Sequence, residues 1–182
     1  LAQAARVVAY PAVRNRGTLG GSLALADPAA DYPVALVASD AVVEVASATG
    51  RRDIPAREFF RGMFDTALTR GEIVAAVRMP GGPAGAGTAY EKLSLVAGDF
   101  AILSVAAIAG KDVCVAIGGY AMKPVPIARL DAAGDVREQA ALALRQLPTP
   151  PDDQRASAGY RRRVAPELVR RAVAAALKAR DE

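Results

Sequence analysis

The sequence of 182 residues contains no histidine, no tryptophan and a single cysteine, Cys114. Without histidine, the chain cannot supply a Ser-His-Asp or Cys-His mechanism, and it lacks the commonest side-chain ligand of transition metals. One cysteine excludes an internal disulfide, a CxxC zinc site and a four-cysteine iron–sulfur cluster. We therefore expect no catalytic residue and no metal site here, and redox chemistry would need an organic cofactor or a neighbouring chain.

Long apolar runs and clustered charges are also scarce. No stretch of about 18 uncharged apolar residues appears, and the opening LAQAARVVAY lacks the basic flank and apolar block of a secretory signal. The net charge is +4, but the basic residues are dispersed apart from YRRR (160–163) and VRR (169–171), and no aromatic stacking motif accompanies them. The sequence thus predicts a cytoplasmic protein that binds no nucleic acid and inserts in no membrane.

Hydrophobic residues make up 52% of the chain, which is enough for a substantial core. Residues 1–9 have helical composition, and we expect Pro11 to end that helix. Residues 28–39, PAADYPVALVAS, predict a second helix with proline in its first turn. Asp27 stands directly before this helix and is expected to cap it.

The next segment alternates between strand and turn signals. Residues 41–47 (AVVEVAS) and 72–80 (EIVAAVRMP) predict strands, and 48–53 (ATGRRD) predicts a hairpin turn. Residues 53–60 (DIPAREFF) lead into a short helix. The glycine-rich segment 81–87 (GGPAGAG) is typical of a flexible linker, where we place a domain boundary.

Beyond this linker, strands come first and helices afterwards. Three strands are predicted at 88–95, 100–109 and 113–121. The chain after Ile127 favours helix, with an amphipathic helix at 136–147 and a long one at 157–179 that Pro166 should kink or divide.

This order predicts an α+β fold with helices on one face of an antiparallel sheet of three or four strands. We expect residues 1–80 and 86–182 to form two domains.

The segment 14–33, RNRGTLGGSLALADPAADYP, carries the strongest functional signal. Glycines at positions 17, 20 and 21 allow positive φ and close approach of the backbone to a ligand, so that successive N–H groups can converge on an anion. The hydroxyls of Thr18 and Ser22 add donors, and the carboxylate of Asp31 could accept hydrogen bonds from a sugar or polyol. These residues taken alone fit either a phosphate cradle or an ordinary structural turn.

Two better-known nucleotide motifs do not fit this segment. There is no GxxxxGK[ST], and GTLGGS is neither GxGxxG nor preceded by a hydrophobic strand. The segment instead resembles the second flavin-binding motif of the FAD subunit of molybdenum hydroxylases, the family of xanthine dehydrogenase and aerobic carbon monoxide dehydrogenase. The resemblance continues through three further blocks, FFRGMFDTALTRGEIVAAVRMP, YEKLSLVAGDFAILSVAAIA and RASAGYRRRVAPELVRRA, in the same order.

The resemblance implies the C-terminal part of a flavin-binding α+β domain, followed by a sandwich like the carbon monoxide dehydrogenase flavoprotein C-terminal domain. It also implies a set of FAD-binding residues. Backbone N–H groups of a glycine-rich turn would hold the diphosphate, an aspartate would bond the ribityl or ribose hydroxyls, and an aliphatic residue and a lysine would lie near the flavin. In this sequence these are Thr18, Leu19, Gly20, Gly21 and Ser22, then Asp31, then Val74 and Lys92.

Two of these residues have plainer alternatives. Val74 could be an ordinary core residue, and Lys92 a solvated strand lysine. The resemblance also implies an upstream lobe that binds the other side of the diphosphate. This chain could accordingly be a fragment, a split subunit or a relic. Without that lobe, we expect the chain alone to bind FAD poorly.

The function implied is that of a flavoprotein subunit. Electrons would pass from a large molybdopterin subunit through [2Fe–2S] clusters on a small subunit to FAD, and from FAD to a terminal acceptor. Such a chain would be part of a heterotrimer or its dimer. The alternative is a truncated, flavin-free interaction module of such a complex.

Overall fold

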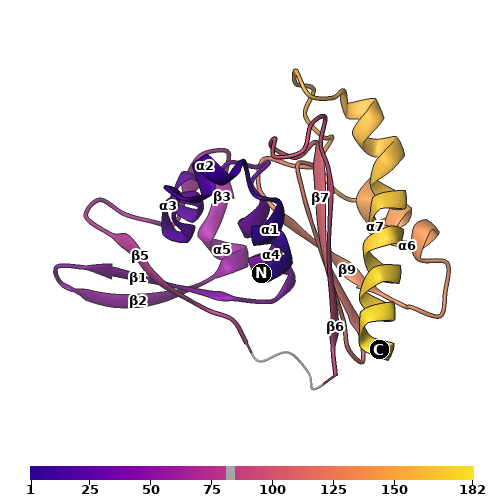
Figure 1. The fold of residues 1–182 in the computed structure, drawn as a ribbon, viewed down its shortest axis with the longest axis horizontal. Helices are drawn as coiled ribbons and strands as arrows, with labels where there is room; N and C mark the ends of the chain where they lie inside the picture. Colours follow the sequence, from indigo (N-terminus) through magenta and orange to yellow (C-terminus); the bar gives the residue numbers. More distant parts are fainter. Residues whose placement is uncertain (81–84) are drawn as a thin grey trace.

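The computed structural model describes residues 1–80 and 85–182, and its larger sheet has four antiparallel strands in the order β6-β7-β8-β9 (Figure 1). These strands are β6 (Gly87–Leu93), β7 (Leu103–Ala109), β8 (Val113–Gly118) and β9 (Val125–Leu130). Strand β7 is buried on both faces because its residues are apolar or small at successive positions.

Helices cover both faces of this sheet (Figure 1). On one face lie α6 (Val136–Arg145) and α7 (Ala158–Asp181), and Val105 of β7 packs with Val169 of α7. On the other face lies α4 (Asp31–Ala38), whose apolar side chains share a core with Ala106 of β7 and Ala116 of β8. Because Ala106 and Ala116 are register partners with small side chains, the α4 backbone can approach the sheet closely.

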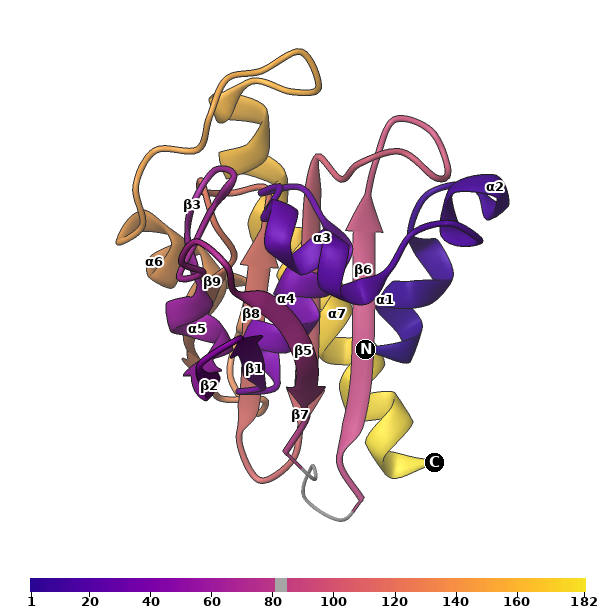
Figure 2. The same ribbon diagram turned by 90° about the vertical axis from the view of Figure 1, so that its left-hand side faces the viewer.

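The first half of the chain also carries a smaller sheet of order β2-β1-β5, together with short helices. Its strands are β1 (Val42–Ser47), β2 (Gly50–Pro55) and β5 (Ile73–Arg78), with a two-stranded pair of β3 (Phe60–Gly62) and β4 (Asp65–Thr66). The remaining helices are α1 (Ala2–Val7), α2 (Pro11–Arg14), α3 (Leu19–Leu25) and α5 (Ala56–Phe59). Figure 2 looks onto this side, with α3 next to β5 and α1 in front of β6.

The α+β fold class and most predicted elements are confirmed, but the expectation that helices lie on only one face of the large sheet is wrong. The prediction assigned every helix of the sandwich to the C-terminal segment, whereas α4 from the first half covers the opposite face. The physical reason is visible in the continuous apolar run of β7, which a sheet with one solvated face would not need.

Three local expectations are also corrected. The chain after Ile127 does not turn to helix at once, because residues 125–130 form the edge strand β9, where Pro126 is tolerated since an edge strand has unpaired N–H positions. Pro166 lies inside an α7 that runs without division, held by its packing on the sheet. The first helix ends before Pro11 as expected, and Tyr10 is extended, but the helix already ends at Val7 and Pro11 begins a further helix, α2.

The predicted boundary at 81–87 falls partly outside the described residues, because 81–84 belong to no described range and Gly87 already begins β6. The division into two domains stays a prediction. No helix among the described residues is both long enough and apolar enough to cross a membrane.

Candidate functional site

The glycine-rich segment forms the N-terminus of helix α3. Thr18 is the N-cap residue, and its Oγ1 accepts a hydrogen bond from the Gly21 N–H at 3.0 Å. The carbonyl of Thr18 accepts from the Ser22 N–H at 3.1 Å. The predicted loop is therefore the first turn of a helix, and two of its five N–H groups are used to build that turn.

The glycines of this turn are not needed for positive φ, contrary to the expectation. Neither Gly20 nor Gly21 has a positive φ, but each lies close to other atoms. A Cβ on Gly20 would lie 3.4 Å from the carbonyl oxygen of Val74, and one on Gly21 would lie 2.9 Å from Thr18 Oγ1. A side chain on Gly21 would therefore crowd the Thr18 cap, whereas the Cβ position of Gly20 is in ordinary van der Waals contact with Val74 of β5.

The N–H groups of Leu19 and Gly20 remain available at the helix start. Within the described residues, no hydrogen bond uses either of them, as is usual for the first turn of a helix. No acidic side chain occurs in this turn. The turn thus presents two outward donors at the positive end of a short helix dipole.

Asp31 is nearly buried, at 5% exposure, and two side chains of β6 hold its carboxylate. Tyr90 Oη donates to Oδ1 at 2.8 Å, and Lys92 Nζ donates to Oδ2 at 2.9 Å. Burial raises the pKa of the Asp31 carboxyl above its ordinary value, although the hydrogen bond and charge of Lys92 and the Tyr90 hydroxyl act in the opposite direction. The three side chains form one polar cluster, which we call the Asp31 cluster.

Lys92 is not a solvated strand lysine. Its side chain is 7% exposed, and its ammonium also donates to the Val7 carbonyl at 3.1 Å, so it connects α1, α4 and β6. Sequence reasoning missed Tyr90, although a signal was present. Positions 90 and 92 are two apart on one strand and therefore share a face of the sheet.

Two hollows flank the Asp31 cluster. The smaller, of about 170 Å³, is lined by Ser22, Leu25 and Asp31 together with Phe100. The larger, of about 480 Å³, has Lys92 in its wall. Its basic and aromatic lining also includes Arg6, Tyr10 and Arg14.

The structure thus brings the predicted residues together in two groups. Gly20 lies against Val74, and Asp31 is paired with Lys92, while Ser22 reaches the hollow beside Asp31. Asp27 does not cap α4, which begins after Ala30. Its Oδ1 instead accepts from the Ala29 N–H at 2.8 Å, closing the turn that precedes the helix.

Comparison with known protein families matches the chain in two parts. Residues 1–82 match the model described as the FAD binding domain in molybdopterin dehydrogenase. Residues 88–176 match the model described as the CO dehydrogenase flavoprotein C-terminal domain.

Individual relatives agree with these matches. The chain is 35% identical to the nicotine 6-hydroxylase medium subunit of Paenarthrobacter nicotinovorans, over 95% of this chain and 65% of that protein. It is 36% identical to the glyceraldehyde dehydrogenase medium chain of Sulfolobus acidocaldarius, over 93% of this chain and 64% of that protein. The chain therefore spans slightly less than two thirds of the length of these relatives.

A solved structure shows the same fold. The carbon monoxide dehydrogenase from Hydrogenophaga pseudoflava, in a form that lacks the Mo-pyranopterin moiety of the molybdenum cofactor, aligns with a TM-score of 0.89 and 33% identity. The alignment covers 98% of this chain and 67% of that one.

Proposed function

Because this chain belongs to the family of FAD-binding medium subunits of molybdenum hydroxylases, we propose that it holds FAD within a multisubunit oxidoreductase. Electrons would arrive from a large molybdopterin subunit through [2Fe–2S] clusters of a small subunit and leave to a terminal acceptor. The observation that carries this proposal is the glycine-dependent first turn of α3 against β5, beside the Asp31 cluster. A cytoplasmic location and the heterotrimer, or its dimer, stay predictions.

The first turn of α3 fits the diphosphate of FAD. The N–H groups of Leu19 and Gly20 are free to donate, no carboxylate of that turn would repel an anion, and glycine at position 20 keeps the backbone uncovered. The hydroxyls of Thr18 and Ser22 lie in the same turn. Gly21 contributes by admitting the tight cap, since its N–H is already bonded to Thr18.

Val74, Asp31 and Lys92 would frame the rest of the cofactor. Val74 supports Gly20 from β5, which fixes the position of the turn. Asp31 already accepts from Tyr90 and Lys92, and each carboxylate oxygen has further lone pairs for a ribityl or ribose hydroxyl. Lys92 lies beside that carboxylate, with its Nζ 2.9 Å from Asp31 Oδ2, and so fixes the orientation of the carboxyl group.

FAD supplies the electron transfer chemistry when bound. The residues of this chain do the binding and the orientation. The buried pairing of Asp31 with Lys92 fixes the side chains at the base of the site, and most of the surface that lines the smaller hollow is apolar.

The test is the flavin content of the protein purified with its partner subunits. In Gly21→Val the new side chain must displace Thr18 Oγ1, which opens the cap and moves the first turn, so we expect FAD content to fall at least tenfold. Ala174→Val is the control, because it also places a valine on a helix, at an exposed position of α7 that lies away from α3.

The melting temperature of each flavin-stripped variant is measured alongside. A turn with only a structural role would lower the melting temperature of the stripped Gly21→Val protein without a separate loss of FAD. Full FAD content in Gly21→Val would contradict the cradle assignment. A colourless wild-type protein that still assembles with partner subunits would favour the flavin-free interaction module instead.

A further inference from the structure

A pocket of about 520 Å³ lies between α6 and α7, on the face of the large sheet opposite α4. Figure 1 shows these two helices on the right of the sheet, away from α3 on the left. Leu144, Leu147 and Pro166 give the pocket an apolar floor, and the ring of Tyr120 lies at its inner side. The proposed flavin site uses none of these residues.

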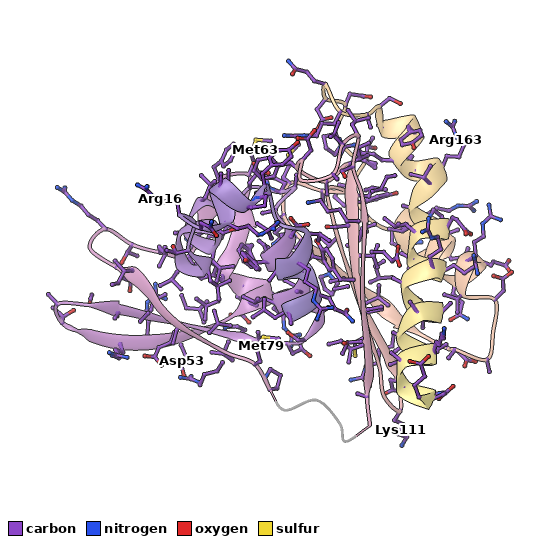
Figure 3. All side chains as sticks on the ribbon, in the orientation of Figure 1. Arg16, Asp53, Met63, Met79, Lys111 and Arg163 are labelled. Carbon is purple, nitrogen blue, oxygen red and sulfur yellow. The ribbon has the colours of Figure 1, made fainter. Side chains whose placement is uncertain are left out.

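Three arginines surround this apolar floor: Arg145 from α6, with Arg162 and Arg163 from α7. Within the described residues, none of them forms an ion pair with a carboxylate, and no acidic residue lines the pocket. Arg162 donates to Thr149 Oγ1, at 2.6 Å. The Arg163 guanidinium lies 5.7 Å from the ring centre of Tyr160, and Figure 3 shows Arg163 pointing away from the sheet.

Neighbouring arginines of the same helix behave differently. Arg170 pairs with Glu167 at 2.7 Å, and Arg171 lies 3.5 Å from Glu91 of β6. Among the residues that the structure describes, carboxylates therefore pair with the arginines further along α7 and with none of those at the pocket. Three exposed guanidinium groups around a pocket without an acidic residue leave a local excess of positive charge.

Pro166 adds a hydrogen-bond acceptor to the same place. In an α-helix the N–H of residue i+4 donates to the carbonyl of residue i, and proline has no N–H. The carbonyl of Arg162 thus lacks its helical donor, and residues four apart lie on one face of a helix, so this carbonyl lies on the pocket side. The pocket offers cationic donors, one carbonyl acceptor that lacks its helical donor, and an apolar surface.

We propose that this pocket, formed by Arg145, Arg162, Arg163 and Pro166, is the docking site for an acidic segment of a partner polypeptide. Side-chain carboxylates bind the guanidinium groups, a backbone N–H donates to the Arg162 carbonyl, and an apolar side chain covers Leu144 and Leu147. An inorganic anion or a nucleic-acid phosphate satisfies the arginines but supplies neither the N–H donor nor an apolar group for the floor. The inference rests on the proposed function in one respect, namely that the chain works in a multisubunit assembly.

The first experiment measures assembly with the co-expressed partner subunits. In the triple variant Arg145→Gln/Arg162→Gln/Arg163→Gln, we expect the dissociation constant of the complex to rise at least tenfold, because centrally placed arginines at interfaces often dominate affinity. The wild-type complex should also weaken with added salt more steeply than the variant. FAD content and melting temperature should stay at wild-type values, since the pocket lies away from α3.

Two control variants test whether the effect on assembly comes from the charge of the pocket arginines, from their guanidinium geometry, or from the loss of surface charge in general. The triple lysine variant at the same positions keeps the charge and should retain part of the affinity, because lysine cannot bind carboxylate as a planar fork. Gln at Arg61, Arg70 and Lys111, which are exposed elsewhere on the surface, should leave assembly unchanged.

The second experiment identifies the occupant. A photo-crosslinking amino acid at Ala141, in the wall of the pocket, should join to a partner segment with at least two acidic residues within about one turn of chain. Crosslinks to a neutral segment, or none in the assembled complex, overturn the proposal, as does a triple glutamine variant that assembles like wild type. Wild-type protein without FAD and without assembly would overturn the proposed function itself, which separates the two failures.

Discussion

Two buried ionic clusters lie on opposite faces of the large sheet, and they are built differently. In the Asp31 cluster, an anion and a cation from α4 and β6 are both nearly buried and satisfy each other. In the second, Arg161 of α7 is 2% exposed, but its carboxylate partner Asp153 is 34% exposed. The first cluster, beside the proposed cofactor site, is a closed pair, meaning that both charged partners are buried. The second is a buried cation whose hydrogen bonds are mostly with backbone carbonyl groups.

Arg161 obtains most of its hydrogen bonds from carbonyl groups at strand ends. Its Nη1 donates to Ile102 at 3.0 Å and to Gly119 at 2.5 Å. Gly119 has φ +72°, and a Cβ there would lie 2.3 Å from the Ile102 carbonyl oxygen, so only glycine brings the two carbonyls within reach of one guanidinium. In the first cluster, a buried charge is paired with another buried ionisable group beside a candidate site. In the second, a buried charge mainly binds carbonyl groups and holds two chain segments together, which we call a structural tie.

The largest expected effect comes from removing the cation of the closed pair. Lys92→Met leaves the buried Asp31 carboxylate without its counter-charge, which should lower the free energy of unfolding by about 3–5 kcal/mol. Urea denaturation at pH 7 measures this effect.

A double variant serves as control for this prediction. Asp31→Leu/Lys92→Met replaces the whole pair by apolar groups and should recover much of the stability, because neither charge is then left unpaired. Equal losses in the single and double variants would contradict the closed-pair description.

A somewhat smaller effect is expected at the second cluster. Arg161→Leu leaves the carbonyls of Ile102 and Gly119 without donors, at a cost on the order of 2–3 kcal/mol, while Asp153 remains in contact with water. Thermal melting and flavin content are measured together. A loss of stability with unchanged flavin per folded protein would agree with a structural role for Arg161. A selective loss of flavin would show that the second cluster also contributes to the cofactor site.

The two carboxylates should respond to pH with opposite sign. The pKa of Asp31 is raised above its ordinary value of 3.8 by burial. At Asp153 burial also acts to raise the pKa, but the N–H groups of Ala156 and Arg155 and the charge of Arg161 outweigh it, and the pKa is lowered. A raised pKa gives stability that is present below pH 3.8 and lost as pH rises through the folded value, whereas a lowered pKa gives stability that is present above pH 3.8 and lost as pH falls.

The asparagine variants measure these slopes. Relative to wild type, Asp31→Asn should become less destabilising as pH rises above about 4, and Asp153→Asn should become less destabilising as pH falls below about 4, each by on the order of 1 kcal/mol or less. Urea titrations between pH 3 and 6 give both slopes. If the destabilisation by both variants changed with pH in the same direction, the two carboxylates would not differ in the sign of their pKa shifts.

The smallest effect is expected at the rim of the second cluster. Arg155 lies 5.4 Å from the ring centre of Phe100 and 3.9 Å from Asp153, and its side chain is 40% exposed. Arg155→Ala should therefore cost about 0–1 kcal/mol. A larger loss would show that the partly exposed side of this cluster contributes as much as its buried side.

Sequence patterns predicted the elements whose signal is local. The alternation in 41–47, the EIVAAVRMP strand and the amphipathic α6 all depend on spacing within one segment, and each was found close to its expected bounds. Gly20 and Asp31 were named from the glycine-rich segment itself, whereas Val74 and Lys92 were named from the resemblance, which carries information about distant contacts that spacing lacks.

The features that sequence reasoning missed depend on tertiary contacts. Nothing in the spacing of 28–39 indicates that α4 packs on a sheet some 70 residues later. In α3, Gly20 lies against Val74 of β5 and Gly21 against the Thr18 cap, and neither glycine has a positive φ. Strand β9 was missed because Pro126 reads locally as a breaker and is tolerated only at a sheet edge. The burial of Arg161 was also invisible, since its partners are carbonyls that any residue could supply.

The packing of α4 on β7 and β8 has a consequence for synthesis of the chain. The apolar side chains of Val34 and Leu36 share a core with Ala106 and Ala116. The ribosome therefore synthesises α4 well before the strands that bury its apolar side chains. The order in which a ribosome releases the polypeptide thus leaves one hydrophobic surface open until β8 has emerged. Contacts of such long sequence separation slow folding, and we expect a chaperone to meet the nascent chain during that interval.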